Sequence, residues 1–146
     1  MAYTLQAIIA KRGVLNRHPL EGANLVSLKQ GYEMLPFTDS FIKKHQIPFL
    51  PLTDEGVEQL PESINKLCTV LSKEQQLAYV EAEFFGGAGT QACVVFENGE
   101  TKLGPMVNES AINEALSVLG AEKTTHYDEF EAIGLDVHRD TNEWVK

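Results

Sequence analysis

Two apolar segments separated by a run of glycines dominate the middle of this sequence. Leu77–Phe85 (LAYVEAEFF) and Thr90–Phe96 (TQACVVF) flank Gly86-Gly87-Ala88-Gly89, and Asn98-Gly99 follows directly. Asn-Gly is the strongest short hairpin signal, because both residues tolerate the positive φ of a tight turn. Thr101–Leu103 then returns as a third short strand. This order predicts an antiparallel β-meander and argues against a βαβ unit.

The length of the glycine connection predicts a register for the first two strands. A four-residue connection pairs Phe85 with Thr90, Glu83 with Ala92, Glu81 with Val94 and Tyr79 with Phe96. Side chains alternate along a strand, so one face holds these residues and the other face is fully apolar. Two carboxylates on one strand face lie roughly 6–7 Å apart. That spacing suits a metal ion, acid–base chemistry, or the grip of a partner's Arg or Lys.

Two interpretations of this acidic face stay open. Antiparallel sheets often have one solvated face, in which case the two glutamates point into water. Alternatively the face is partly buried and serves recognition, because Phe85, Val94 and Phe96 would otherwise be exposed without use.

Further elements are expected on both sides of the meander. Apolar residues recur at helical spacing over Leu60–Leu71 and Ala111–Leu119, and Thr4–Ala10 is typical of a strand. Asn108 is expected as the N-cap of the second helix and Gly120 as the residue after its end. The elements predict an α+β protein: an antiparallel meander sheet of about four to five strands packed against two or three helices, as one domain over residues 1–146.

Charge is distributed unevenly along the chain. Residues 1–50 carry three acids and six bases, a net of +3, whereas residues 51–146 carry 18 acids and six bases, a net of −12. The acidic excess excludes a general nucleic-acid binder, which needs a basic surface for phosphates. It favours a protein partner with a basic surface and fast electrostatic association. The other interpretation is that the acidic surface only maintains solubility.

Two stretches are candidate binding segments. The glycine run with the residues after it could present N–H groups to an anion, although a tight hairpin with a bulge is the favoured interpretation. It is not a phosphate loop, because it lacks the Lys-Ser/Thr ending and leads into a strand. The second stretch, Asp128–Trp144, combines acids with aromatic residues that suit a protein interface.

The sequence contains no recognisable catalytic or metal-binding motif. His138-Arg139-Asp140 matches a kinase triplet by letters only, because residue 145 is Val where that motif needs Asn. Cys68 and Cys93 lie in apolar stretches without zinc-ligand spacing, so we expect two buried free thiols. We therefore assign no catalytic residue, metal ligand or cofactor, and we lean towards a protein that is not an enzyme.

Targeting signals are also missing from the sequence. The first residues lack the basic region of a signal peptide, and no segment approaches the roughly 20 apolar residues of a membrane span. These features favour a cytoplasmic protein without membrane contact.

The central segment carries a family resemblance. The string Tyr79–Ala92 (YVEAEFFGGAGTQA), followed by Ala111–Leu116 and Asp128-Glu129-Phe130, resembles a family of small uncharacterised bacterial proteins. That family has a V-E-A-E-[FY]-F-G-G-x-G-T-Q core and a D-E-F-x-x-[IL]-G-L ending, here Asp128–Leu135. The resemblance covers about half of the chain, mainly residues 77–144, and implies no activity. In size and acidity the chain is also similar to immunity proteins of bacterial toxin systems.

The leading hypothesis is a non-enzymatic protein-binding module, including an immunity protein that neutralises a basic toxin domain. The residues expected to contact the partner or a ligand lie on the sheet, at the glycine run and in the tail: Glu81, Glu83, Phe85, Gly86, Gly87, Gly89, Thr90, Gln91, Asp128, Glu131 and Trp144. One alternative is a small-molecule binder or enzyme that uses Gly86–Gly89 with Glu81 and Glu83. Another is a homodimer joined through the mixed sheet face.

Overall fold

The computed structural model describes residues 2–17, 20–85 and 88–145 of this chain. Its strands form one antiparallel sheet in the order β2-β3-β1-β4-β5-β6. The strands are β1 (Ala2–Lys11), β2 (Val26–Ser27), β3 (Tyr32–Pro36), β4 (Gln76–Phe85), β5 (Ala88–Glu97) and β6 (Glu100–Asn108). The helices are α1 (Asp39–His45), α2 (Glu62–Leu71), α3 (Ala111–Leu119) and the short α4 (Glu129–Ala132), with 3-10 turns η1 (Leu15–Arg17), η2 (Lys29–Gly31) and η3 (Thr141–Val145). The predicted α+β class is confirmed, and the sheet is wider than expected because β2 and β3 add an edge.

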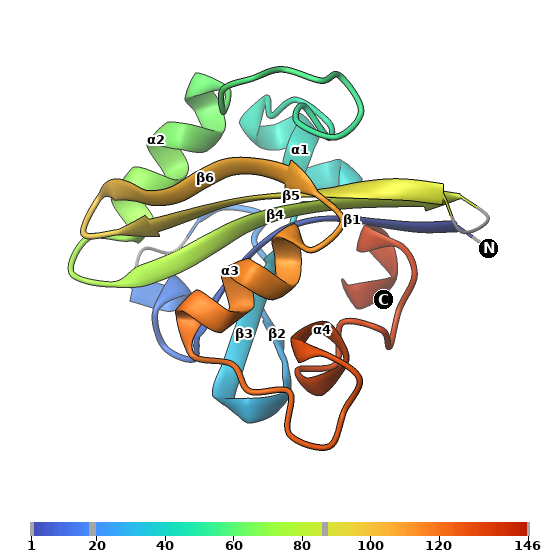
Figure 1. Cartoon of the computed structure of the whole chain (residues 1–146). Helices are drawn as coiled ribbons and strands as arrows, with labels where there is room; N and C mark the ends of the chain where they lie inside the picture. Colours follow the sequence, from blue (N-terminus) through green and yellow to red (C-terminus); the bar gives the residue numbers. More distant parts are fainter. Residues whose placement is uncertain (1, 18–19, 86–87, 146) are drawn as a thin grey trace.

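Helices cover both faces of the sheet (Figure 1). On one face Phe41 of α1 and Ile64 of α2 pack against Tyr79 and Phe96 of the sheet. On the other face α3 and α4 cover an apolar surface formed by alternate residues of β4 and β5, namely Ala78, Val80, Ala82, Cys93 and Val95. Because side chains alternate between the two faces of a strand, β4 and β5 contribute residues to two separate cores.

The two cysteines lie in different cores, one on each side of the sheet. Cys68 of α2 and Cys93 of β5 are both buried and free, as the sequence predicts. Burial raises the pKa of both thiols, that of Cys93 to about 12. Each side chain therefore packs as a small hydrophobe.

The register of β4 against β5 differs from the predicted one by two residues. Phe85 pairs with Ala88, Glu83 with Thr90 and Glu81 with Ala92. The prediction placed Gly89 in the connection, but it lies inside β5, where a Cβ atom would overlap the backbone of Glu83 and the ring of Phe84. Because the shift is two residues and not one, every side chain stays on its predicted face.

The segment between β5 and α3 also departs from the prediction. β6 extends to Asn108 although Gly104-Pro105 interrupts the pattern, because an edge strand tolerates a missing N–H and two register shifts absorb the irregularity. Asn108 is not the N-cap of α3. Its carboxamide oxygen accepts a hydrogen bond from the Ser110 N–H at 2.8 Å, and Ser110 occupies the cap position. Gly120 ends α3 in the left-handed conformation, as predicted.

The C-terminal tail completes an open edge of β1. β3 pairs only with Ala7–Lys11, so the first half of β1 has no strand on that side. There the Thr4 N–H donates to the carbonyl of Arg139 at 2.8 Å, and the Gln6 N–H donates to Oγ1 of Thr141 at 3.1 Å. The same hydroxyl donates to the Thr4 carbonyl at 3.2 Å. The tail therefore takes the place of a strand at this edge.

In the described part of the chain, none of the helices has the length and apolar character that crossing a bilayer requires.

Replacing Thr141 by Val should destabilise the fold. The substitution keeps the shape but leaves the buried N–H of Gln6 without an acceptor, which costs about 1–3 kcal/mol. Urea unfolding measures the change, and Thr141→Ser, which keeps the hydroxyl, should lose clearly less. Equal stability of the Val variant and the wild type would contradict this role of the tail.

Candidate functional site

Glu81 of β4 is fully buried, and donors surround both of its carboxylate oxygens. Oε1 accepts hydrogen bonds from the N–H groups of Leu52 and Thr53 at 3.1 and 2.9 Å, and from Oγ1 of Thr53 at 3.0 Å. Oε2 accepts from the Tyr79 hydroxyl at 2.6 Å and from the Leu52 N–H at 3.2 Å. The carboxylate therefore fastens the connection between α1 and α2 to the sheet.

A second buried polar side chain extends this attachment. Gln6 lies opposite Glu81 on β1, and its Nε2 donates to the Pro48 carbonyl at 3.0 Å and to the Tyr79 hydroxyl at 2.9 Å. Its Oε1 accepts from the Leu50 N–H at 3.2 Å. We call Gln6, Tyr79 and Glu81 the buried polar network. It holds residues 48–53 mainly by their backbone groups, and the hydroxyl of Thr53 is the one side-chain donor of this segment among these bonds.

Burial and hydrogen bonding act in opposite directions on Glu81. Desolvation raises its pKa, while the bonds from Tyr79, Thr53 and Leu52 lower it, and the net shift is upward. Desolvation also raises the pKa of Tyr79, and the charge of Glu81 adds to that shift. All acceptor positions of Glu81 face donors of this chain, so it has no free group for a partner.

Glu83, two residues along the same face, has a different environment. Its side chain is partly exposed, and its pKa is raised first by desolvation and then by the nearby carboxylate of Asp54. No ion pair reaches Glu83 or Asp54 among the residues that the structure describes. Two carboxylates that approach each other repel, and a positive charge beside them would relieve that repulsion.

Exposed apolar side chains share the sheet face of Glu83. The register places Phe85, Thr90 and Val107 on the same face as Glu83. The ring of Phe85 is 60% exposed and Val107 is 50% exposed. We call Glu83, Phe85, Thr90, Val107 and Asp54 the acidic–apolar face. The sequence left open whether this face of β4 is solvated or partly buried. The structure shows that the face is buried as far as Glu81 and becomes exposed from Glu83 onwards.

The other residues predicted around the glycine run have structural roles or lie outside the described residues. Gly86 and Gly87 lie outside the described residues. Gly89 is required by the close approach of β4. Gln91 is buried, and its Oε1 accepts a hydrogen bond from the Ile112 N–H at 2.9 Å. Gln91 thus supplies the acceptor at the start of α3 that the Ser110 side chain does not supply.

The three tail candidates are partly occupied by internal contacts. Asp128 caps α4 by accepting from the Glu131 N–H at 2.9 Å, and it accepts from Asn113 of α3 at 3.1 Å. Glu131 lies 3.3 Å from His126. Trp144 is partly buried against the core on the α3 side of the sheet, and its ring makes an edge-type contact with His138. They lie on the α3 side of the sheet, so the structure does not bring them together with Glu83 and Phe85.

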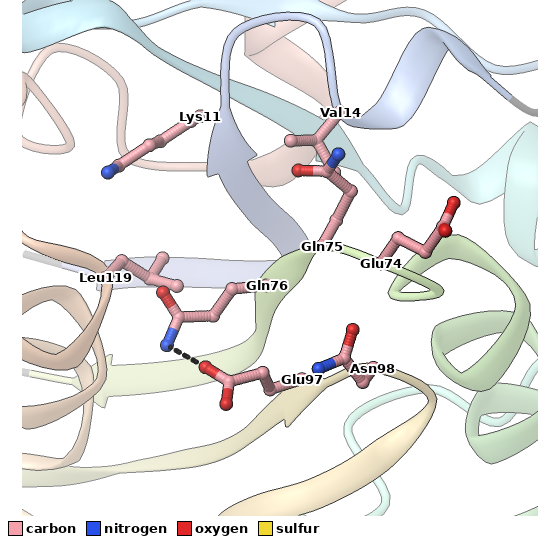
Figure 2. Close-up of a pocket in the computed structure, with 8 residues that line it drawn as sticks. All are labelled: Lys11, Val14, Glu74, Gln75, Gln76, Glu97, Asn98 and Leu119. Carbon is pink, nitrogen blue, oxygen red and sulfur yellow. Dashed lines mark hydrogen bonds between the residues drawn. The ribbon is translucent and has the colours of Figure 1, made fainter.

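One well-formed hollow lies away from these candidates. It has a volume of about 330 Å³ and lies where β4 begins and β5 ends, opposite the Phe85 end of the hairpin (Figure 2). Both of its acids are already engaged: Glu97 accepts from Gln76 at 3.2 Å and from Lys102 at 3.0 Å, and Glu74 lies 3.7 Å from Arg17. Lys11 also lines the hollow, and no ion pair among the described residues includes it. The hollow therefore offers a ligand the charge of one lysine but no free carboxylate.

Neither a search for metal-ligand clusters in the described residues nor comparison with known proteins indicates a function. Within residues 2–17, 20–85 and 88–145, no three His, Cys, Asp or Glu side chains gather as a metal site needs. Comparison with protein-family models, curated proteins and solved structures finds no match for this chain. The functional conclusion therefore depends on the residues described above.

Sequence reasoning missed Asp54 and Gln6. Asp54, Glu55 and Glu58 precede α2 and Glu62 is its first residue, and acids are typical of a helix N-terminus. Its approach to Glu83 depends on the path of residues 48–53, which no local pattern encodes. Gln6 did leave a signal, because it is a polar residue inside the apolar run of β1.

Glu81→Gln should lower stability, with a deficit that depends on pH. The amide presents an NH2 donor to the N–H groups of Leu52 and Thr53, which costs about 1–3 kcal/mol. Glu81 binds its proton more tightly in the folded chain, so its contribution is full below its ordinary pKa and is lost as the pH rises through the raised value. Urea unfolding at about pH 4 and about pH 7 should therefore show that the variant's free energy of unfolding lies below that of the wild type by an amount that decreases as the pH rises. A deficit that widens would refute the raised pKa.

Asp54→Asn should lower the pKa of Glu83. The substitution removes the like charge beside Glu83 but not its desolvation, so the pKa falls yet stays above the ordinary value. Carbon-detected NMR titration of the side-chain carboxyls measures the shift. Glu55→Gln is the matched control, since Glu55 is not among the groups that shift Glu83. An unchanged pKa in the Asn variant would show that the two carboxylates are not neighbours in solution.

Proposed function

We propose that this chain is a non-enzymatic module that binds a protein with a basic surface, and that it acts as an immunity protein towards a basic toxin domain. The observation that supports this best is the carboxylate pair Glu83 and Asp54, which has no cation partner among the described residues and stands beside the exposed ring of Phe85. Charge and an aromatic anchor on one rigid face are the features expected of such an interface.

Electrostatics favours a basic partner both at long range and at direct contact. The net charge of −12 over residues 51–146 attracts a positive protein from afar and speeds its approach. At contact, an Arg or Lys placed between Glu83 and Asp54 would relieve the repulsion that helps to raise the pKa of Glu83. Arg suits this position better, because its planar guanidinium donates to two carboxylates at once.

Phe85 supplies the apolar part of the contact. Aromatic side chains that lose water at the centre of an interface often dominate its binding energy. Phe85 shares its face with Thr90 and Val107, so a partner residue that covers the ring also covers these neighbours. The acids then form the rim that sets orientation and association rate.

The buried polar network makes this face rigid before binding. Residues 48–53 are held by bonds to Gln6 and Glu81, and Asp54 follows directly. A group that is already in place loses little conformational entropy on association, which improves affinity. Glu81 therefore supports the interface from below without touching the partner.

The position of Glu81 also bears on the alternatives. A small-molecule site or enzyme built from Glu81 and Glu83 together needs both carboxylates free, and the acceptors of Glu81 are occupied by this chain. This weakens the alternative in which Glu81 and Glu83 together bind a small molecule. A homodimer through the same face uses the same residues, and sedimentation at high concentration distinguishes it from a complex with a second protein.

The proposal is tested by identifying the partner and then measuring its affinity for designed variants. The tagged chain captures proteins from its native host at low and high salt, and the purified partner is titrated against each variant. The double variant E83Q/D54N and the variant F85A should each weaken binding about tenfold or more. The charge effect should shrink at high salt, whereas the effect of F85A should persist.

A matched control removes two charges elsewhere. Glu100 and Glu122 are exposed, and Glu100 lies at the end of the β5–β6 hairpin away from Val107, so E100Q/E122Q changes the net charge equally outside the acidic–apolar face. This control should reduce the association rate only slightly. A partner without a basic surface, or equal affinities for E83Q/D54N and E100Q/E122Q, would contradict the proposal.

A further inference from the structure

A second hollow, of about 300 Å³, lies on the other side of the sheet and takes no part in the proposed interface. It is lined by Tyr3, Phe84, Phe130, Asp136 and Arg139. Tyr3 and Phe84 come from the paired ends of β1 and β4, and the other three residues come from α4 and the tail. Figure 1 shows this region, where the red C-terminal segment lies beneath the blue start of β1.

Three aromatic rings form the walls of this hollow. The ring centroid of Tyr3 lies 6.2 Å from that of Phe84 and 5.4 Å from that of Phe130, and both pairs are tilted. The Tyr3 hydroxyl donates to the Leu135 carbonyl at 2.8 Å, and the Phe130 N–H donates to Asn113 at 2.9 Å. Internal bonds therefore fix the walls, so the hollow exists without a ligand.

Two opposite charges line the same hollow without meeting. Asp136 and Arg139 are both exposed, and no ion pair joins them in the described part of the chain. Both are close enough to the Tyr3 hydroxyl to act on its pKa, Asp136 upward and Arg139 downward, although burial is the main cause of its rise. The hollow thus presents an acceptor and a bidentate donor, separated in space, beside an aromatic wall.

We propose that this hollow binds a small aromatic zwitterion, the chemistry of a free aromatic amino acid. The ring of the ligand contacts Tyr3, Phe84 and Phe130, as offset or tilted aromatic pairs favour. The ammonium group of the ligand donates to Asp136, and its carboxylate accepts from the guanidinium of Arg139. One ligand therefore satisfies all three chemical features of the site.

Size and charge together select this class over others. A volume of about 300 Å³ is at the lower limit for ligand pockets, which suits one amino acid better than a nucleotide. An aromatic residue at a peptide terminus carries only one of the two charges, and an internal aromatic residue carries neither. A zwitterion is the only one of these that neutralises both Asp136 and Arg139.

The test measures binding of L-phenylalanine to the full chain by saturation-transfer NMR and calorimetry. The comparison ligands are 3-phenylpropanoic acid, which lacks the ammonium group, and 2-phenylethylamine, which lacks the carboxylate. L-Phenylalanine should bind about tenfold more tightly than either, because each analogue leaves one charge of the site unpaired. Similar affinities for all three ligands would overturn the zwitterion proposal.

Variants of the two charged residues locate the binding site. D136N and R139Q change exposed side chains, so the fold should survive, which circular dichroism confirms, and each should weaken L-phenylalanine binding about tenfold. E122Q and K123Q make the same charge changes in the exposed segment after α3 and should bind like the wild type. Unchanged binding by D136N and R139Q would refute the proposal. Equally tight binding of N-acetylphenylalanine amide would also refute it, because the hollow would then accept a partner's side chain.

Discussion

The buried carboxylate of Glu81 is the constraint on which the arrangement of this molecule depends. A carboxylate inside a protein must find donors, because leaving it unpaired costs several kcal/mol, about as much as a typical domain can lose. β4 places Glu81 in the interior, and the donors come from Leu52, Thr53 and Tyr79. These bonds hold the connection between α1 and α2 in its position over the sheet. That position brings Asp54 to Glu83 and sets the acidic–apolar face, so a buried group determines an exposed one.

Local sequence patterns predict most of the fold, and each error in that prediction has an identifiable physical cause. Alternation along Leu77–Phe85 was sufficient to assign both faces of β4, and it survived a wrong connection length because the error was an even number of residues. Gly89 misled the prediction, since a glycine needed for close strand approach cannot be told from a turn glycine by type. Asn108 misled it in the same way, because the Asx turn that ends β6 and a helix N-cap use the same side chain.

The candidate site was predictable only in part. Glu81 and Glu83 have the same residue type and face the same side of β4, yet one is saturated with internal bonds and the other is partly exposed. The difference comes from residues 48–54, about thirty positions earlier, and no periodicity in the sequence reports where such a connection will lie. Phe85 followed from alternation, whereas Asp54 and the hollow around Tyr3 arise from tertiary packing alone. Opposite faces of one sheet thus carry an acidic surface and an aromatic hollow.

The attachment of the tail to β1 has a consequence for the order of events during biosynthesis. β1 leaves the ribosome before β2 to β6, but the acceptors for the N–H groups of Thr4 and Gln6 are Arg139 and Thr141. Until those residues emerge, that half of β1 carries unsatisfied backbone groups at an open edge, which neighbouring nascent chains can pair with. This edge of the sheet is therefore completed only after residues 139–141 have been translated.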